Sequence, residues 1–405
     1  MFDQLADQLA KDYWQLTVPL LAGVIGWFTN WLAIVMMFKP VEFIGIKPYL
    51  GWQGIVPANA VRLAQTGLQL VTTQLLRIPE LFDDFDAEAL VKGESARMRA
   101  LIRDSIERKA SEQFPQMWNA LAPSIKDQVF DAAEKEVTAL SVDVFKSAAA
   151  DVEQLIDVQR IVTDAVERDK SLMNDTFLRV GEKEFKFIEL SGLYFGVIFG
   201  VPQLLFWLWY PEAWVLPFFG ALVGYITNWL ALVLVFDPKT PRRILGFSIQ
   251  GLFHRRQREI AVEFAEVVSA RVFSNENLFR ELSEGGSRQR LLALVGSKAD
   301  ELIARYEKHP MAMMFMKPEI VAGIRSEVLR DVEGEMFRQG GLVHQFVSKS
   351  EKIRKTLAER MAVMDSEAYE NVLRPAFKQD EWKLILAGAV LGAVAGAVQL
   401  SFYAV

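Results

Sequence analysis

The chain has 405 residues, of which 51% are apolar, 45 are basic, 51 are acidic and none is cysteine. The absence of cysteine excludes a disulfide framework, a thiolate nucleophile and a zinc site of the cysteine type. A net charge of -6 argues against a protein whose main role is to bind nucleic acid, because such proteins need a clustered basic face.

Four long uncharged blocks account for the high mean hydropathy of +0.16. The first covers residues 18–38 after an N-terminal tail of residues 1–17, the second and third cover residues 190–209 and 214–236, and the fourth covers residues 384–403. Each block is long enough to cross about 30 Å of hydrocarbon as a helix. We therefore predict four transmembrane helices. The first is not expected to be a cleaved signal peptide, because the tail before it is acidic and the apolar block is too long.

Two large polar segments lie between these blocks, at residues 39–189 and 237–383. We call them lobe 1 and lobe 2. An even number of crossings separates them, so both must lie on the same side of the membrane. Lysine and arginine residues flank the blocks on the lobe side, whereas Lys11 is the only basic residue on the other side. This bias predicts a multi-pass protein of the bacterial inner membrane with both lobes in the cytoplasm.

The lobes are expected to be helical. Pro123 opens a stretch in which apolar residues recur every three or four positions as far as Leu155, which is the pattern of an amphipathic helix. Pro318 begins the equivalent stretch of lobe 2. A glycine-marked turn follows the first and third blocks, and each turn leads into another amphipathic stretch, starting near Val61 and Ile260. These two stretches are expected either to lie on the membrane or to pack within the lobes.

The chain contains an internal repeat of about 197 residues. Residues 19–40 align without gaps on residues 217–238, and the sequence TNWLA occurs in both. The second and fourth blocks also match, since glycines and a glutamine recur at equivalent positions. Each copy consists of a span, a lobe and a second span, so the two copies must be parallel in the membrane. The predicted fold is an all-α integral membrane protein with four transmembrane helices in two parallel tandem repeats and two helical extramembrane lobes.

These motifs resemble those of a known family. The TNWLA helices followed by Phe-x-Pro, the glycine-marked turn, and the span with glycines four residues apart are similar to the YheB/YjiN-type bacterial membrane proteins, a family of unknown function. The resemblance extends along the whole chain. It implies an integral inner-membrane protein with helical extramembrane lobes, and it implies no activity and no catalytic residues.

Polar side chains within the spans are the first candidate site. Asn30 and Asn228 occupy equivalent positions, and an amide in hydrocarbon must find a hydrogen-bond partner. The main interpretation is that they join helices, with their amides facing each other across a pseudo-two-fold axis, and the alternative is a polar pathway or ligand site. The other intramembrane polar candidates are Thr29, Thr227, Gln203 and Gln399.

Small residues form the second candidate feature. Glycines spaced four residues apart place a smooth stripe on one face of a helix, which allows a close helix contact. The predicted helix-packing residues are Gly192, Gly196, Gly200, Gly388, Gly392 and Gly396.

A basic cluster follows the third span. We expect it to face solvent or lipid headgroups, because basic residues near the membrane bind anionic lipids. The predicted headgroup-binding residues are Arg242, Arg243, Arg255, Arg256 and Arg258.

The predicted function is non-enzymatic. The three histidines lie far apart in sequence, and no known metal-protease, nucleophile-elbow or phosphate-loop motif is present. We expect no catalytic residue, no metal and no cofactor. The expected role is that of a scaffold or lipid-interacting protein with membrane lipids as partners, together with a second copy of the chain or another envelope protein, and without nucleic acid. The alternative is a conduit for an ion or small solute along the pseudo-two-fold axis, lined by Asn30 and Asn228.

Overall fold

The structure is a computed structural model that describes residues 17–46, 50–244, 247–307, 330–374, 378 and 381–403. The chain divides into two compact units. Unit 1 comprises Met1–Leu75, Thr163–Val268 and Lys355–Val405, and unit 2 comprises Leu76–Val162 and Ser269–Arg354. Each unit therefore combines segments from both halves of the chain.

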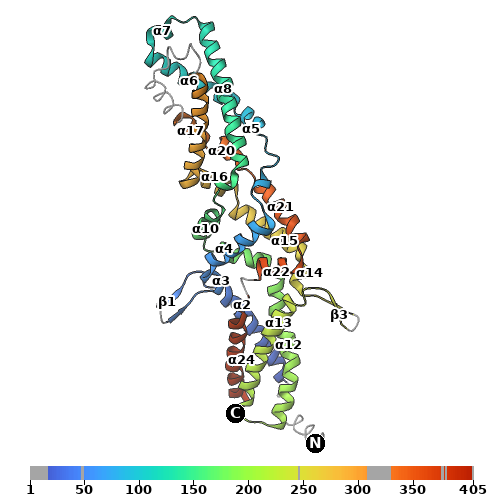
Figure 1. The fold of residues 1–405 in the computed structure, drawn as a ribbon. Coiled ribbons are helices and arrows are strands. Elements are labelled where there is room, and N and C mark those ends of the chain that lie inside the picture. Colours follow the sequence, from blue (N-terminus) through green and yellow to red (C-terminus); the bar gives the residue numbers. More distant parts are fainter. Residues whose placement is uncertain are drawn as a thin grey trace. The chain divides into compact units, whose positions relative to one another are not determined.

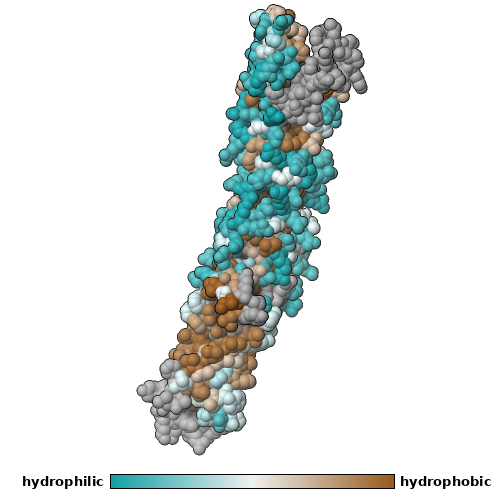
Figure 2. Space-filling view, turned by 90° about the vertical axis from the view of Figure 1, so that its left-hand side faces the viewer, coloured by the Kyte–Doolittle hydropathy of each residue, from teal (hydrophilic) through white to brown (hydrophobic). Residues whose placement is uncertain are grey.

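Unit 1 contains four helices that are long and apolar enough to cross a membrane: α2 (Val18–Phe38), α12 (Glu182–Trp209), α13 (Val215–Phe236) and α24 (Glu381–Tyr403). They lie side by side, with α2 packed along α12 and α13 packed along α24 (Figure 1). Their outer faces expose large apolar side chains such as Val24, Ile198 and Val394, and the surface of this part is brown in Figure 2. An apolar surface of this kind is suited to lipid.

Two of these helices begin earlier than the uncharged blocks do. Helix α12 starts at Glu182 rather than at residue 190, and α24 starts at Glu381 rather than at residue 384. The difference has a simple cause, because hydrophobicity limits the part that lies in hydrocarbon, whereas backbone hydrogen bonding continues until a residue or turn interrupts it.

The sequence predicts only a turn at each of the two glycine-marked positions, whereas the structure has a β-hairpin at both. Strands β1 (Ile44–Ile46) and β2 (Leu50–Trp52) pair antiparallel after α2, and strands β3 (Arg242–Ile244) and β4 (Phe247–Ile249) pair antiparallel after α13. The two hairpins project on opposite sides of unit 1 (Figure 1).

The remaining helices of unit 1 follow the hairpins or precede the spans. They are α3 (Ile55–Ala58), α4 (Ala60–Leu70), the π-helical turn η2 (Val71–Leu75), α11 (Leu172–Val180), α14 (Leu252–Arg255), α15 (Gln257–Val267) and α22 (Ser366–Leu373). Helices α4 and α15 correspond to the two amphipathic stretches that the sequence predicts either on the membrane or within the lobes. Leu63 and Ala64 of α4 and Ile260 and Phe264 of α15 are buried, so these faces pack within unit 1.

Unit 2 contains η3 (Pro79–Leu81), α5 (Ala87–Gly93), α6 (Ser95–Gln113), α7 (Pro115–Ala120), α8 (Pro123–Ala150), α9 (Val152–Leu155), α16 (Asn275–Ser283), α17 (Gly285–Glu307) and α20 (Leu342–Phe346). Helices α10 (Val158–Arg168) and α21 (Ser350–Val363) and the π-helical turn η4 (Val268–Val272) cross the boundary between the units. Helix α8 begins at Pro123 as the apolar spacing predicts, but the helical run breaks at Asp151 before continuing to Leu155. The helix expected at Pro318 lies outside the described residues.

Candidate functional site

Glycines bring the backbones of α2 and α12 into direct contact. A Cβ atom added at Gly192 would lie 2.2 Å from the carbonyl oxygen of Gly26, and one added at Gly196 would lie 2.4 Å from the carbonyl oxygen of Ala22. At Gly200 the nearest atom would be the Cα of Pro19, at 2.7 Å. The three predicted packing glycines of α12 therefore face α2, and no larger residue fits there without separating the helices.

Helices α13 and α24 repeat this arrangement. A Cβ added at Gly388 would lie 2.6 Å from the carbonyl oxygen of Gly224, and one at Gly392 would lie 2.1 Å from that of Gly220. One at Gly396 would lie 2.3 Å from the carbonyl oxygen of Leu216. The two helix pairs thus use the same backbone contact.

The close approach allows each asparagine to reach the backbone of the neighbouring helix. Asn30 Nδ2 donates to the carbonyl oxygen of Ile188 at 2.6 Å, and Asn228 Nδ2 donates to the carbonyl oxygen of Leu384 at 2.7 Å. Both acceptors lie one helical turn before a packing glycine, Gly192 or Gly388. The amide nitrogens therefore bond to backbone carbonyls rather than to each other.

The other polar side chains of the four long helices are buried, and the two threonines bond within their own helices. Thr29 and Thr227 are buried, and their hydroxyls donate to the carbonyl oxygens of Gly26 and Gly224 in their own helices. Gln203 on α12 and Gln399 on α24 are buried as well. Neither glutamine lines the pocket described next.

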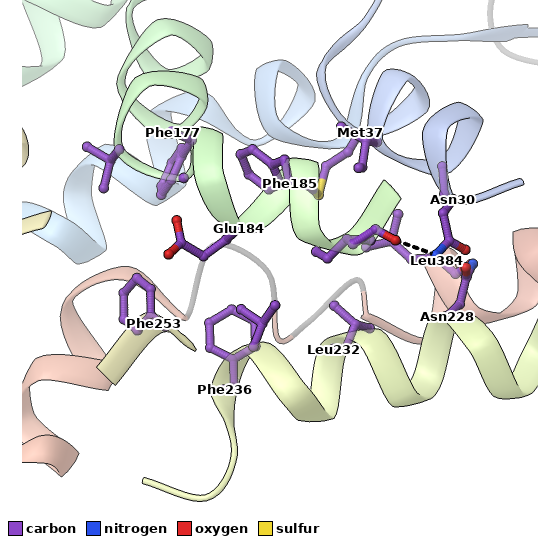
Figure 3. A pocket seen from close by; sticks show the side chains of 16 residues that line it. Asn30, Met37, Phe177, Glu184, Phe185, Asn228, Leu232, Phe236, Phe253 and Leu384 are labelled. Atoms are coloured by element: carbon purple, nitrogen blue, oxygen red, sulfur yellow. Dashed lines mark hydrogen bonds between the residues drawn. The ribbon is translucent and has the colours of Figure 1, made fainter. Parts of the chain in front are cut away.

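A pocket lies where the four helices meet the first helices outside the bundle (Figure 3). The pocket is partly open rather than fully enclosed. Asn30 and Asn228 lie next to one another at one end, and Glu184 lies toward the other end (Figure 3). The other lining residues are apolar or glycine: Ala33, Ile34, Met37, Phe177, Val180, Gly181, Phe185, Ile188, Leu232, Val235, Phe236, Phe253 and Leu384.

The carboxylate of Glu184 is neutralised by Arg256. Arg256 Nη1 lies 2.6 and 2.8 Å from the two carboxylate oxygens, and Arg256 Nε lies 2.9 Å from Glu259. The Glu184 and Arg256 side chains are only 5% and 13% exposed. Arg256 is therefore held by an internal ion pair, whereas the other four arginines of the predicted headgroup cluster are exposed: Arg242, Arg243, Arg255 and Arg258.

His254, next to this ion pair in sequence, is buried rather than solvated. Its ring lies near those of Phe253 and Tyr369, and its Nε2 is 3.8 Å from Glu370, which also binds Lys239 at 2.9 Å. Burial lowers the pKa of His254, against the opposing attraction of Glu370. His254 therefore packs inside unit 1, and its burial disfavours the charged form of the ring.

The two hairpins are attached to the spans by equivalent hydrogen bonds. The Gly54 amide donates to the Pro40 carbonyl at 2.9 Å, and the Gly251 amide donates to the Pro238 carbonyl at 3.0 Å. Beyond this attachment the β1–β2 hairpin exposes its apolar side chains. The exposed fractions of Ile46 and Leu50 are 75% and 77%. Sequence reasoning missed this feature because exposure depends on which neighbours the fold provides.

Sequence reasoning also missed the partners of the asparagines and of Glu184. The only available signal was that Glu184 and Glu381 occupy equivalent places before the second and fourth blocks. Within the described residues no group of three or more histidine, aspartate or glutamate side chains is arranged to hold a metal ion.

Comparison with known proteins identifies relatives among bacterial membrane proteins. A UPF0754 membrane protein of Thermosynechococcus vestitus is 45% identical over 73 residues, which are 17% of this chain and 18% of the relative. One from a Picosynechococcus species is 29% identical over 174 residues, 42% of each chain. One from Staphylococcus epidermidis is 29% identical over 86 residues, 20% of this chain and 23% of the relative.

The matching stretches cover less than half of the length of these relatives. No family model and no solved structure matches the chain. The four apolar helices and these relatives together define the protein as a helical membrane protein, similar to the UPF0754 membrane proteins of bacteria. The names of these relatives state no activity.

Proposed function

We propose that the protein is a non-enzymatic, lipid-interacting scaffold of the bacterial inner membrane, and that its two hairpins lie in the membrane interface. The observation that carries this proposal is the exposure of Ile44, Ile46 and Leu50 directly beside the end of α2. In water such a surface would cost about 25 cal/mol for each Å² of apolar area, whereas the acyl boundary of a lipid leaflet would cover it. Trp52 on the same hairpin is of the residue type that favours this depth.

Charge supports the same placement for the second hairpin. Arg242 and Arg243 are exposed on β3, and Arg255 and Arg258 are exposed shortly after the hairpin. Basic side chains near a membrane surface attract anionic lipid headgroups, each contributing about 1 kcal/mol. The proposed headgroup site therefore consists of these four arginines, without Arg256.

The organisation of unit 1 supports a tandem duplication and the orientation that follows from it. Helix α3 begins at Ile55 and α14 at Leu252, while α4 begins at Ala60 and α15 at Gln257, so each pair is separated by the same 197 residues. We propose two parallel repeats of the YheB/YjiN type, with the segments that follow α2 and α13 in the cytoplasm, because basic residues gather on that side of the spans.

An expected result tests the placement of the hairpins. Because the chain lacks cysteine, a single cysteine at Ile46 can carry an environment-sensitive fluorophore in protein reconstituted into vesicles of phosphatidylethanolamine and phosphatidylglycerol. Its emission should be shifted to the blue and quenched by lipids that carry bromine near the headgroup. The matched control is a cysteine at Asp104 on α6, whose side chain is 76% exposed and which should report water. Equal emission and equal quenching at the two positions would refute an interfacial hairpin.

Orientation is tested by labelling in intact cells. Cysteines at the exposed positions Asp104 and Glu351 should be protected from a membrane-impermeant thiol reagent, whereas a cysteine at Glu212, between α12 and α13, should react. After permeabilisation all three should react, which shows that each site is accessible. Labelling of the cysteines at positions 104 and 351 in intact cells would contradict the proposed orientation.

The second candidate function is a conduit along the axis of the bundle. The asparagine pair favours it, because these polar side chains lie between the two helix pairs. The apolar lining of the adjoining pocket opposes it, since a hydrated ion needs polar groups along its path. A binding pocket accounts better for the same residues.

A further inference from the structure

At one end of the pocket between the spans lie two buried hydrogen-bond acceptors that have no partner in the described part of the chain. Asn30 is completely buried and Asn228 is 4% exposed. The Oδ1 atoms of both accept no hydrogen bond from any described residue. Their Nδ2 atoms donate to Ile188 and Leu384, which fixes which end of each amide is the oxygen. A buried acceptor without a partner costs about 1–3 kcal/mol, so two of them together indicate a ligand.

The chemistry of this ligand follows from what the site contains. Each amide nitrogen uses one of its two N–H groups, so the asparagine end presents two unused acceptors and one further N–H on each amide. A carboxylate or phosphate would leave water for an apolar pocket without a free positive charge, which costs several kcal/mol. A cation would exchange its hydration shell for two neutral oxygens in an apolar pocket, which costs several kcal/mol. The carboxylate of Glu184 does not compensate for such a charge, because Arg256 already holds it.

A neutral group with two donors satisfies both oxygens. Apart from Asn30, Asn228 and Glu184, the residues that line the pocket are apolar or glycine. The pocket follows α2 from Asn30 to Met37, a stretch of helix about 10 Å long.

We propose that this pocket binds a neutral amphiphile with two adjacent hydroxyl groups and an apolar chain of about 10 Å. One hydroxyl donates to Asn30 Oδ1 and the other to Asn228 Oδ1, while the chain lies against Met37 and Phe236 toward Phe177. This proposal rests on the lipid-interacting function and gives it a specific ligand class.

The test uses three ten-carbon probes that differ only at one end: 1,2-decanediol, 1-decanol and decane. The full-length protein is incubated with each in detergent, and native mass spectrometry counts the molecules retained per chain. Two hydrogen bonds of about 1 kcal/mol each predict that the apparent affinity for the diol exceeds that for decane by roughly thirtyfold, with the alcohol between them. Decanoate and decylammonium should be retained less than the diol.

Variants identify the site. In the double variant Asn30→Leu/Asn228→Leu, the ratio of the apparent affinity for the diol to that for decane should fall to about one. The control variant Gln203→Leu removes a buried amide outside the pocket and should keep the affinity ratio of the unmodified protein. A ratio near one in the unmodified protein would overturn the proposal and would mean that only water meets the two oxygens. Because the probe series alone decides this, the test stands even if the double variant does not fold. The fluorophore experiment on the hairpin uses none of these probes. A failure of the proposed ligand can therefore be distinguished from a failure of the proposed lipid-interacting function.

Discussion

Replacing Gly192 by alanine should destabilise the protein, by about 1–3 kcal/mol. The added methyl group would lie 2.2 Å from the carbonyl oxygen and 2.6 Å from the carbonyl carbon of Gly26, and a backbone cannot move aside as the end of a side chain can. Gly388→Ala should have a similar effect, because its methyl group would lie 2.6 Å from the carbonyl oxygen of Gly224. Thermal unfolding in one detergent measures the loss.

Gly67 provides a matched control with the opposite expected sign. It lies in α4, and an added Cβ would have nothing within 4 Å. Gly67→Ala should therefore raise stability by about 0.5–1 kcal/mol, because alanine favours a helix over glycine. If Gly192→Ala unfolded at or above the temperature of the unmodified protein, the direct backbone contact between α2 and α12 would be wrong.

Removing Arg256 should have the largest effect of any single charged residue discussed above. Arg256→Met would leave the Glu184 carboxylate, whose side chain is 5% exposed, buried without its partner, at an expected cost of about 3–5 kcal/mol. Glu184→Gln in addition should recover much of the loss, since the neutral amide no longer needs a counter-charge. Unfolding of the two single variants and the double variant gives the coupling energy.

The control for this pair is another arginine of unit 1. Arg179 binds Glu266 at 2.7 Å, but the two side chains are 52% and 48% exposed. Arg179→Met should cost at most about 1 kcal/mol, because water screens an exposed ion pair. Equal losses for Arg179→Met and Arg256→Met would show that burial does not distinguish the two pairs.

The relation between sequence and structure differs between the spans and the site. An uncharged block of about 20 residues can satisfy its backbone in hydrocarbon only as a helix, so the existence of α2 and α13 follows from composition. The glycines at every fourth position mark the faces where these helices meet, since this spacing places them on one side. These features are local, and a single sequence contains them.

The contacts that form the pocket could not be predicted from the sequence. Asn30 binds a carbonyl group 158 residues away, and Glu184 binds a guanidinium group 72 residues away. Distances in sequence of this size carry no geometric information, and backbone carbonyls are present at every residue, so no residue type marks the acceptor. Symmetry predicts that Asn30 and Asn228 face each other, but the atoms that they bind depend on how closely α2 approaches α12 and α13 approaches α24.

What the sequence determined by itself is thus the number of long apolar helices and the faces on which they pack, because hydrophobic length and side-chain period act over one or two helical turns. Only the tertiary structure decided that Arg256 is an internal counter-ion instead of a surface charge, that Ile46 is exposed on a hairpin, and that two amide oxygens remain available in an apolar pocket. Each of these depends on which atoms the fold brings within about 3 Å of a side chain or keeps away from it, and hydrogen bonding and desolvation are decided at that distance.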